Sequence, residues 1–267
     1  MSGPEHWSPP PLLYASAAVH LGAVAASLAR PHLWPIALGA VAANHAVLAA
    51  AGLLPRSRLL GANLLRLPRQ DGQPGRAAIT IDDGPDPDVT PRVLDQLASH
   101  GACATFFCIG DRVRRYPHVA RQIVARGHSI ENHSQRHRHD FSLMGPRRMG
   151  AEISRAQETI QAVAGVAPRF FRAPAGLRNP FLDPILVRLG LRLASWTRRG
   201  FDTVNSNADD VLRRLVHPLQ SGDILLLHDG NCARGVSGAP VILDVLPRLL
   251  DILAENRLET VALRAAL

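Results

Sequence analysis

The sequence predicts a parallel α/β domain, an irregular barrel of seven β/α units, that follows an N-terminal α-helical membrane hairpin. Three observations support this prediction. Short apolar runs alternate with amphipathic stretches from residue 77 to the end of the 267-residue chain. Polar clusters follow several of these runs, as they do at the carboxyl ends of barrel strands. The first fifth of the chain is far more apolar than the rest and holds two long uncharged stretches.

The alternation of strands and helices after residue 76 indicates a parallel sheet, because parallel strands need a crossover that is usually helical. About seven strands over roughly 190 residues suit a barrel somewhat smaller than the common eight-stranded one. One helix is expected after Thr90-Pro91, with the hydroxyl as N-cap and the proline in the first turn. The predicted strands are 77–81, 104–109, 128–132, 169–172, 191–196, 223–227 and 259–263. The other predicted helices lie near 117–126, 146–164, 180–189, 208–215 and 240–255.

Two stretches without charged side chains, 11–29 and 33–54, are each close to the length of about 20 residues that crosses a bilayer as a helix. Alanine, glycine and serine recur in both, as in helices that pack closely in lipid. We therefore expect a membrane-embedded hairpin over residues 1–54. The alternatives are a signal peptide followed by a soluble helix, or two helices that lie in the interface. The tail before residue 11 has no arginine or lysine, which disfavours a signal peptide.

A basic linker is expected over residues 55–76, which are rich in arginine, proline and glycine. Basic residues that flank a membrane span tend to lie on the cytoplasmic side. This rule places the linker, and the domain of residues 77–267, on the cytoplasmic face. Asn44 and His45 lie inside the second apolar stretch, where they either serve a function or bond to the partner helix.

The formal net charge is +8, and the chain contains no lysine, so arginine supplies the positive charge. This charge favours contact with phosphate groups or an anionic membrane surface. A GC-rich genome would also place arginine wherever a cation is tolerated. No arginine-rich helix interleaved with aromatic residues occurs, so no nucleic-acid partner is expected. The three cysteines show neither the spacing of a zinc finger nor the pattern of a disulfide scaffold.

Two adjacent carboxylates, Asp82 and Asp83, follow the first predicted strand and enter a Gly-Pro turn. Side chains at such a turn point in different directions, so one carboxylate can bind a metal while its neighbour stays free as a base. Acidic residues beside Gly-Pro are also ordinary turn formers. The pair by itself therefore leaves both interpretations open.

His133 and His137 follow the third predicted strand. Their spacing predicts that both imidazoles lie on one face of a helical turn, where they can share one cation. Two histidines and one carboxylate would leave a coordination position open for water, which is the catalytic pattern. His139 is interpreted as a solvated loop residue, and chance pairs are possible in a chain with twelve histidines.

Three further polar clusters follow later strands. The first is residues 172–176, Arg-Ala-Pro-Ala-Gly, the second runs from Trp196 to Asp202, and the third is a buried strand that ends in His228. A lone histidine at a strand end is more often a satisfied structural residue. Five polar clusters predicted at one rim make a functional role the better interpretation.

The order and spacing of these five clusters resemble those of the polysaccharide deacetylase domain, or NodB homology domain, of carbohydrate esterase family 4. The resemblance covers residues 77–267, and five motifs in one order are far more specific than any one of them. Residues 80–85 match the family's T-F-D-D-G-P with isoleucine in place of phenylalanine. Residues 133–137 match its H-S/T-x-x-H, 172–176 its R-x-P-Y/F-G, and 225–229 its L-x-L-H-D. Trp196 and Asp202 match the fourth motif more loosely.

The resemblance implies that Asp83, His133 and His137 hold a divalent metal ion, zinc or cobalt. A cation in such a site makes water nucleophilic near neutral pH because it stabilises hydroxide. Asp82 would be the general base that accepts the proton of the water molecule. Arg172 would orient Asp82 and keep it ionised.

The same resemblance assigns roles to residues of the later motifs. The oxyanion would be stabilised by the metal and by the backbone N–H of Ala175, beside Pro174. His228 would be the general acid that protonates the departing amine, with Asp202 holding its imidazole. Trp196 would lie on the substrate side of the site.

Three departures from the family pattern concern the walls of the site. Ala175 replaces the usual aromatic residue, Thr203 stands where the family often has tryptophan, and Arg199 stands where an acid is common. The substrate is therefore less determined than the reaction.

These residues predict a metal-dependent hydrolase that removes the acetyl group of an N-acetylated sugar, a unit of N-acetylglucosamine type in a free, polymeric or lipid-linked glycan. The alternatives are a deacylase or deformylase of a lipid-linked amino sugar, an O-acetyl esterase, and an inactive glycan-binding domain. The expected partners are the glycan and the lipid bilayer, and the expected location is a bacterial inner membrane with the domain on the cytoplasmic side.

Overall fold

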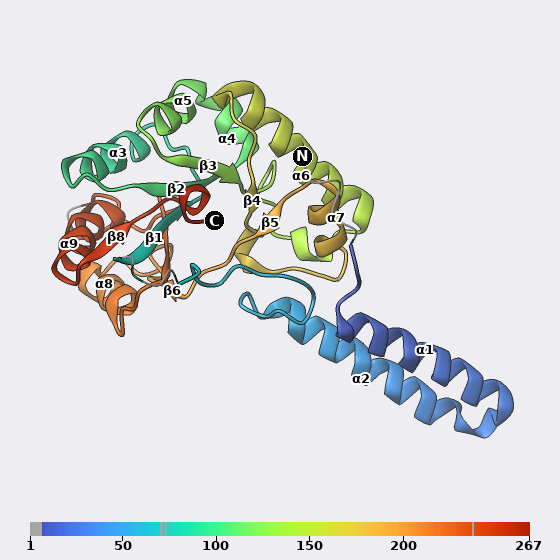
Figure 1. Cartoon of the computed structure of the whole chain (residues 1–267). Coiled ribbons are helices and arrows are strands. Elements are labelled where there is room, and N and C mark those ends of the chain that lie inside the picture. The colour runs from blue at the N-terminus through green and yellow to red at the C-terminus, as the bar shows by residue number, and fades with distance from the viewer. Residues whose placement is uncertain (1–6, 70–71, 73, 237) are drawn as a thin grey trace.

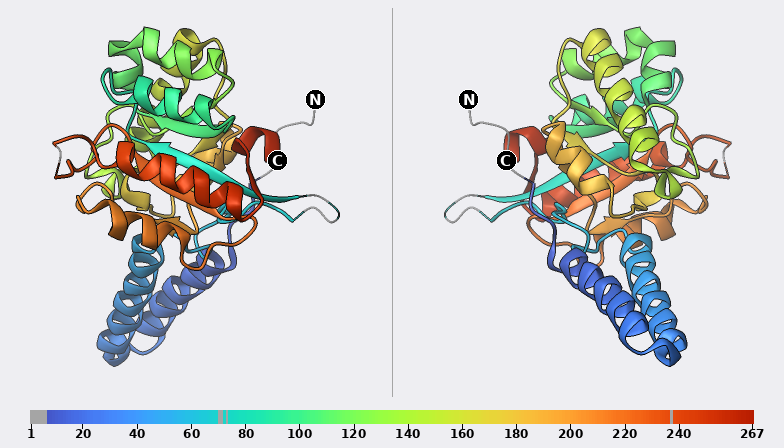
Figure 2. Two further views of the ribbon diagram at one scale, coloured as in Figure 1. Left: turned by 90° about the vertical axis from the view of Figure 1, so that its left-hand side faces the viewer. Right: turned by 90° about the vertical axis from the view of Figure 1, so that its right-hand side faces the viewer.

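The computed structural model describes residues 7–69, 72, 74–236 and 238–267. Figure 1 shows an α/β domain built around a curled sheet and a pair of helices, α1 and α2, that projects from it. The two side views in Figure 2 show the same projection. In the described residues the sheet has eight parallel strands in the order β5-β4-β3-β2-β1-β7-β6, and β8 pairs with the beginning of β1.

The bounds of these elements follow the chain in order. The strands are β1 (Gly75–Asp82), β2 (Ala104–Cys108), β3 (Ser129–Asn132), β4 (Phe170–Phe171), β5 (Arg192–Leu193), β6 (Arg198–Arg199), β7 (Ile224–His228) and β8 (Leu258–Thr260). The α-helices are α1 (Pro11–Ala29), α2 (Trp34–Leu53), α3 (Thr90–Ser99), α4 (Gly110–Arg115), α5 (Pro117–Ala125), α6 (Pro146–Ala164), α7 (Leu182–Arg188), α8 (Ala208–Val216), α9 (Ile242–Glu255) and α10 (Leu263–Ala266).

The predicted parallel α/β barrel is confirmed, and each predicted strand has a counterpart. Helix α6 has the predicted bounds, whereas β4 and β5 are shorter than the runs 169–172 and 191–196. Strand β6 and helix α4 were not predicted. Both are short and arginine-rich, and β6 owes its extended form to its pairing with β7 rather than to an apolar period.

The predicted N-cap at Thr90 is wrong. Helix α3 begins at Thr90 itself, after Val89, and no side chain caps it. The Thr90 hydroxyl donates to Asp229 Oδ2 at 2.5 Å and accepts from the backbone N–H of Asp86 at 2.8 Å. The hydroxyl therefore joins the start of α3 to the loop that follows β7.

The two faces of strand β1 separate the core from the site. Ile79 and Ile81 are fully buried in the cluster between the sheet and its covering helices, and burial of such a side chain contributes about 1.5–3 kcal/mol. Because side chains alternate along a strand, Thr80 and Asp82 point to the inner side of the curled sheet. Asp82 is paired in register with His228 at the end of β7, so both reach the same rim.

Part of the segment expected to form a linker lies against the domain. Leu64 forms a parallel bridge with Ala194 beyond β5, and Arg66 forms an antiparallel bridge with Asp223 before β7. Leu67 is buried among the residues inside the curled sheet. This segment thus spans the opening between the two ends of the sheet.

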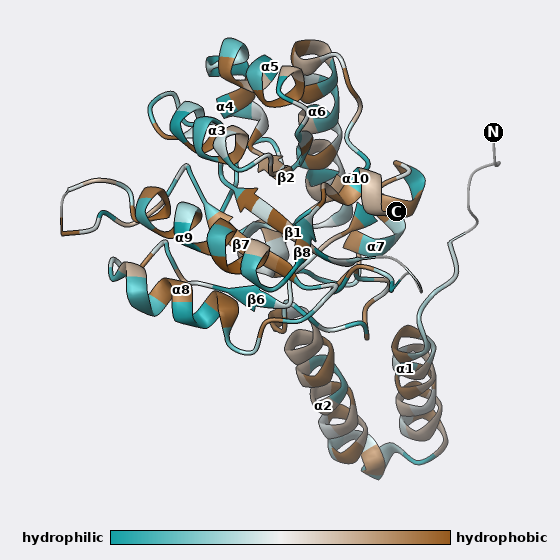
Figure 3. Cartoon of the chain, turned by 60° about the vertical axis from the view of Figure 1, so that its left-hand side comes forward, coloured by the Kyte–Doolittle hydropathy of each residue, from teal (hydrophilic) through white to brown (hydrophobic). Residues whose placement is uncertain are grey.

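Helices α1 and α2 are long and apolar enough to cross a membrane by length and composition. Figure 3 shows mostly white to brown residues on both helices. Large apolar side chains are exposed along them, including Leu21, Leu28, Ile36 and Leu38. This exposure is compatible with the predicted hairpin, because the domain covers little of either helix.

The polar residues of the two helices contact one another. Asn44 Nδ2 donates to Ser16 Oγ at 2.9 Å, and the facing Nε2 atoms of His20 and His45 lie 3.3 Å apart. His20 Nδ1 also donates to the Ser16 carbonyl at 2.7 Å. Asn44 and His45 therefore bond to the partner helix.

Candidate active site

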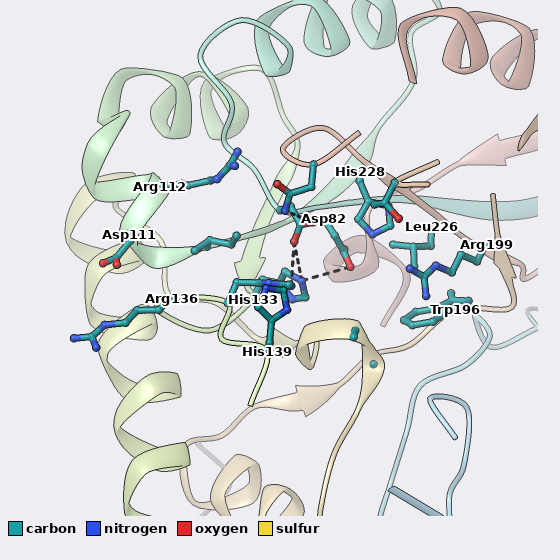
Figure 4. A pocket seen from close by; sticks show the side chains of 17 residues that line it. Asp82, Asp111, Arg112, His133, Arg136, His139, Trp196, Arg199, Leu226 and His228 are labelled. Atoms are coloured by element: carbon teal, nitrogen blue, oxygen red, sulfur yellow. Dashed lines mark hydrogen bonds and ion pairs between the residues drawn. The ribbon is translucent and has the colours of Figure 1, made fainter. Parts of the chain in front are cut away.

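A cavity of about 620 Å³ opens at the carboxyl ends of the strands. Residues in or after strands β1 to β7 line it. Asp82 ends β1, Ile109 follows β2, His133 follows β3, Ala175 follows β4 and His228 ends β7. The view in Figure 4 shows Asp82, His133 and His228 pointing toward one another. This is the rim at which a parallel barrel gathers polar side chains.

Asp82 is held by a buried arginine. Arg172 Nη1 donates to Asp82 Oδ1 at 2.7 Å and to Thr80 Oγ1 at 2.8 Å. The other guanidinium nitrogens donate to the carbonyls of Ala194 and Ser195. Arg172 is only 1% exposed. Its complete set of partners fixes one oxygen of Asp82 and leaves Oδ2 toward the cavity.

Asp83, His133 and His137 converge. Asp83 Oδ1 lies 3.3 Å from His133 Nε2 and 3.2 Å from His137 Nε2. The predicted helical turn is wrong, because the two histidines lie in a loop in which Ser134 and His137 have positive φ angles of 64° and 50°. Asp83 also has a positive φ of 72°, which turns its side chain away from that of Asp82.

These three side chains fit a divalent cation. His133 Nδ1 donates to the Arg172 carbonyl at 2.8 Å, so the neutral ring presents the lone pair of Nε2 to Asp83. Asp83 Oδ2 accepts from Asn231 Nδ2 at 3.0 Å, whereas the buried Oδ1 has no hydrogen-bond partner. The one carboxylate oxygen and two imidazole nitrogens all lie within 4.8 Å of one another. An orphaned oxygen among nitrogen ligands is the donor set that zinc and similar ions prefer.

The ionisation of the three groups follows from their mutual contacts. Burial would raise the pKa of Asp83, but the adjacent His133, with the charges of His228 and His137, holds this pKa well below its usual range. Burial would lower the pKa of His133, but Asp82 and Asp83 raise it. Burial and the charge of His133 lower the pKa of His137 to about 4. Asp83 is therefore ionised throughout the neutral range.

His228 has a separate carboxylate partner. Its Nδ1 donates to Asp202 Oδ1 at 2.9 Å, and its backbone N–H donates to Asp202 Oδ2 at 2.7 Å. Burial would lower the pKa of His228, but Asp202, Asp82 and Asp83 raise it to about 8. Asp202 is fully buried. The imidazole is thus fixed in orientation and protonated at neutral pH.

The residues expected on the substrate side are only partly in the cavity wall. Ala175 lines the cavity with a positive φ of 54°, and Trp196 lines it with 7% of its surface exposed. Pro174 is buried and does not line the cavity. Arg172 and Asp202 also lie outside the lining and act on it through Asp82 and His228.

Several lining residues were not expected from the sequence. Asn231 follows His228 by three positions, and only the fold shows that its amide reaches Asp83. Asp111, Arg112 and Arg136 line the side of the cavity that lies to the left in Figure 4. Helix α4, which carries Asp111 and Arg112, gave no apolar period that would have marked it.

His139, interpreted as a solvated loop residue, is exposed and also lines the cavity. It lies outside the group of one carboxylate and two imidazoles that converge. The loop after β3 has no helical period, so the loop conformation determines that His137 rather than His139 turns toward Asp83.

The arrangement combines two halves of a hydrolytic reaction. A carboxylate, Asp82, and a protonated imidazole, His228, face one cavity beside a cluster able to hold a cation. Such a set can deprotonate water on one side of a carbonyl and protonate a leaving group on the other. The cavity is lined by polar residues together with a few apolar ones.

Comparisons with known proteins agree with this geometry. Residues 69–194 match the family model described as polysaccharide deacetylase. A peptidoglycan-N-acetylglucosamine deacetylase of Bacillus cereus is 36% identical over 174 residues, 64% of this chain and 80% of that protein. A chitooligosaccharide deacetylase of Azorhizobium caulinodans is 36% identical over 153 residues, 57% of this chain and 72% of that protein.

A solved structure shows the same fold. The family 4 carbohydrate esterase of Streptomyces lividans, in complex with acetate, superposes with a TM-score of 0.63 and 31% sequence identity. The match covers 70% of this chain and 91% of that one. The chain therefore belongs to the polysaccharide deacetylase family, carbohydrate esterase family 4.

Proposed function

We propose that the protein is a metal-dependent hydrolase that removes the acetyl group from the nitrogen of an N-acetylglucosamine-type sugar. The observation that carries this proposal is the buried, unpartnered Oδ1 of Asp83 facing His133 and His137. Relatives that deacetylate peptidoglycan or chitooligosaccharides support the substrate class.

Asp83, His133 and His137 would hold the metal ion, zinc or cobalt. Such an ion polarises the acetyl carbonyl and lowers the pKa of water, so that hydroxide is available near neutral pH. The contact between His133 Nδ1 and the Arg172 carbonyl fixes the ring nitrogen that faces the ion. Asn231 fixes the carboxylate of Asp83 in the same way.

Asp82 is the general base of the proposed reaction. Its Oδ2 accepts a proton from water as the oxygen attacks the acetyl carbon, and Arg172 holds the carboxylate in place through Oδ1. The backbone N–H of Ala175 would donate to the oxyanion, which the small side chain leaves accessible. Trp196 would form an apolar part of the cavity wall beside the sugar.

His228 is the general acid. When the carbon–nitrogen bond breaks, His228 Nε2 donates its proton to the departing nitrogen, which leaves as a neutral amine. The contact with Asp202 stabilises the imidazolium until that step. The products are acetate and a free amino sugar.

We further propose that residues 1–54 anchor the domain of residues 77–267 to a bacterial inner membrane, with the segment 55–76 between them. The exposed apolar surface of α1 and α2 supports a lipid environment. The arginines after α2 favour the cytoplasmic face for the domain. Labelling of a single introduced cysteine at the exposed Val204 in intact cells, against lysed cells, tests that orientation.

The proposed reaction is tested by acetate release from N-acetylated chitooligosaccharides with detergent-purified protein. Release should stop with a chelator, return with zinc or cobalt, and be absent in Asp82→Asn. Release that persists in metal-free protein would overturn the metal-dependent reaction. No release from folded, metal-loaded protein on any N-acetylated glycan would overturn deacetylation itself.

A lipid-linked amino sugar, acetylated or formylated, is a second candidate substrate. One observation favours it, which is that the residues directly after α2 contact the neighbours of Trp196, a residue of the cavity wall. The Pro55 carbonyl accepts from Ser195 Oγ at 2.8 Å, and Arg56 Nη1 donates to the Thr197 carbonyl at 3.2 Å. If α2 spans the bilayer, the cavity therefore lies at the membrane surface. Acyl release from a polyprenyl-linked amino sugar in vesicles, compared with a soluble chitooligosaccharide, separates the two substrates.

A further inference from the structure

Arg199 places an isolated positive charge in the cavity wall. Strand β6 contains only Arg198 and Arg199, whose side chains point to opposite faces. Arg198 turns outward, where its Nη1 donates to the His217 carbonyl and its Nε lies 3.6 Å from Asp223. Arg199 lines the cavity, and Figure 4 shows it beside Trp196.

Two aromatic rings hold the Arg199 guanidinium in place. Its central carbon lies 5.6 Å from the ring centroid of Trp196 and 4.9 Å from that of Phe201. Such contacts favour a cation and restrict the orientation of its planar group. The side chain is thus positioned before any ligand arrives.

The charge of Arg199 has no partner within the described part of the chain. No ion pair or hydrogen bond joins its guanidinium to those residues, and its buried Nε has no hydrogen-bond partner. The other cavity arginines differ. Arg112 lies 3.6 Å from Asp86, and Arg136 lies 3.8 Å from Glu152. The nearest acid in sequence, Asp202, is occupied by His228.

We propose that Arg199 binds a negatively charged group of the substrate, so that the preferred substrate is an N-acetylated sugar carrying a phosphate or carboxylate. This inference rests on the proposed deacetylation. A planar guanidinium with free N–H groups is the side chain best suited to a two-oxygen contact with either anion. A neutral chitooligosaccharide would leave this charge without a partner.

The position of Arg199 also indicates where the anion lies. Arg199 pairs in register with Leu226, two residues before His228, and Leu226 lines the cavity too. The anion is therefore bound on the side of the cavity that carries the proton donor to the amine. Asp83 and the two histidines line the cavity from other strands, so the anion and the acetyl group need not compete.

Three matched probes test the inference: N,N′-diacetylchitobiose, its 1-phosphate, and its aldonic acid, which carries a carboxylate at the same end. We expect wild-type kcat/KM to be at least about tenfold higher for one charged probe than for the neutral one, since a charged contact of this kind is worth a factor of ten or more. Comparison of kcat/KM for the 1-phosphate and for the aldonic acid shows which anion Arg199 prefers. Arg199→Gln should remove the preference for the charged probe over the neutral one, mainly through an increase in KM for the charged probe.

Arg214→Gln is the matched control. Arg214 is exposed on α8 and its guanidinium also lies over Phe201, at 5.6 Å, but it does not line the cavity. It should keep the preference for the charged probe. Equal kcat/KM of the wild type on all three probes, or an unchanged preference in Arg199→Gln, would overturn the inference.

A binding measurement separates this inference from the proposed reaction. If no probe releases acetate, calorimetry of the 1-phosphate and the aldonic acid with wild type and Arg199→Gln still reports the contact. Weaker binding in the variant supports the anion site even where deacetylation fails. Equal binding in both proteins, or none in either, would contradict it.

Discussion

Two parts of the cavity differ in how their charged side chains are paired. We call the part with Asp82, Asp83 and His228 the floor, and the part with Arg199 the wall. On the floor, Asp82 is paired with Arg172 and His228 with Asp202, each through buried hydrogen bonds. On the wall, Arg199 is held by aromatic rings and lacks an acidic partner among the described residues. The fold itself therefore organises the floor, whereas we propose that a substrate anion completes the wall. On this proposal, the reaction chemistry and the choice of substrate are located in different parts of one cavity.

The largest effect is expected when the floor loses its proton donor. His228→Gln keeps the approximate size of the side chain but cannot donate a proton to the departing amine. We expect kcat for acetate release to fall by about 10²–10⁴-fold, the usual contribution of a general acid. The thermal unfolding temperature should also fall, because the buried Asp202 loses its charged partner. A variant with wild-type kcat would show that the amine is protonated by another group.

A smaller effect is expected when the partner of the acid is changed. The pKa of His228 is raised to about 8, with Asp202 as the leading favourable cause after the opposing effect of burial. Activity that needs the protonated imidazole is lost as pH rises through this pKa. Asp202→Asn should move that alkaline limb of the pH profile of kcat to lower pH, because it removes the stabilising charge. If the alkaline limb does not move, a group other than His228 causes it.

The contact between Asn231 and Asp83 allows the metal affinity of the site to be tested apart from its catalytic groups. Asn231→Ala removes the donor to Asp83 Oδ2 without removing a proposed metal ligand. Loss of a group that orients a ligand typically costs about 10–100-fold in metal affinity. Zinc affinity, measured by competition with a chelating dye, should fall by this amount. Activity at saturating zinc should recover in large part, which a direct catalytic role of Asn231 would prevent.

Asn231 also shows why part of the site could not be predicted. The sequence motifs placed Asp83, His133 and His137 at one rim, and the structure brings them together. The contact of Asn231 with Asp83 joins residues 148 positions apart, so no local pattern reports it. The histidine spacing indicated convergence correctly, but for the wrong reason. Positive φ angles in a loop, rather than a helical period, turn the two rings toward Asp83.

The fold was predictable to a similar extent. Apolar runs and amphipathic stretches identify the buried strands and long helices because both patterns follow from burial on one side. Strand β6 and helix α4 lack such patterns, since pairing with β7 and packing on the domain determine them. The contacts of Leu64 and Arg66 with the sheet were hidden by the composition of the segment 55–76, which resembles that of a linker.

The smallest effect is expected far from both floor and wall. Asn44→Ala removes the hydrogen bond to Ser16 between α1 and α2. Hydrogen bonds between membrane helices contribute about 0.6 kcal/mol on average, so the hairpin should weaken only slightly. Unfolding in detergent should show a small decrease in stability, while kcat/KM for acetate release stays at the wild-type value. A large loss of activity would mean that the hairpin controls the cavity.

Zinc titration of metal-free protein, with bound metal and acetate release recorded together, tests the central claim most directly. The account predicts one zinc ion per chain, activity in proportion to occupancy, and loss of both in the double variant His133→Ala/His137→Ala. Full acetate release from the metal-free protein, or zinc bound equally well by the double variant, would contradict it.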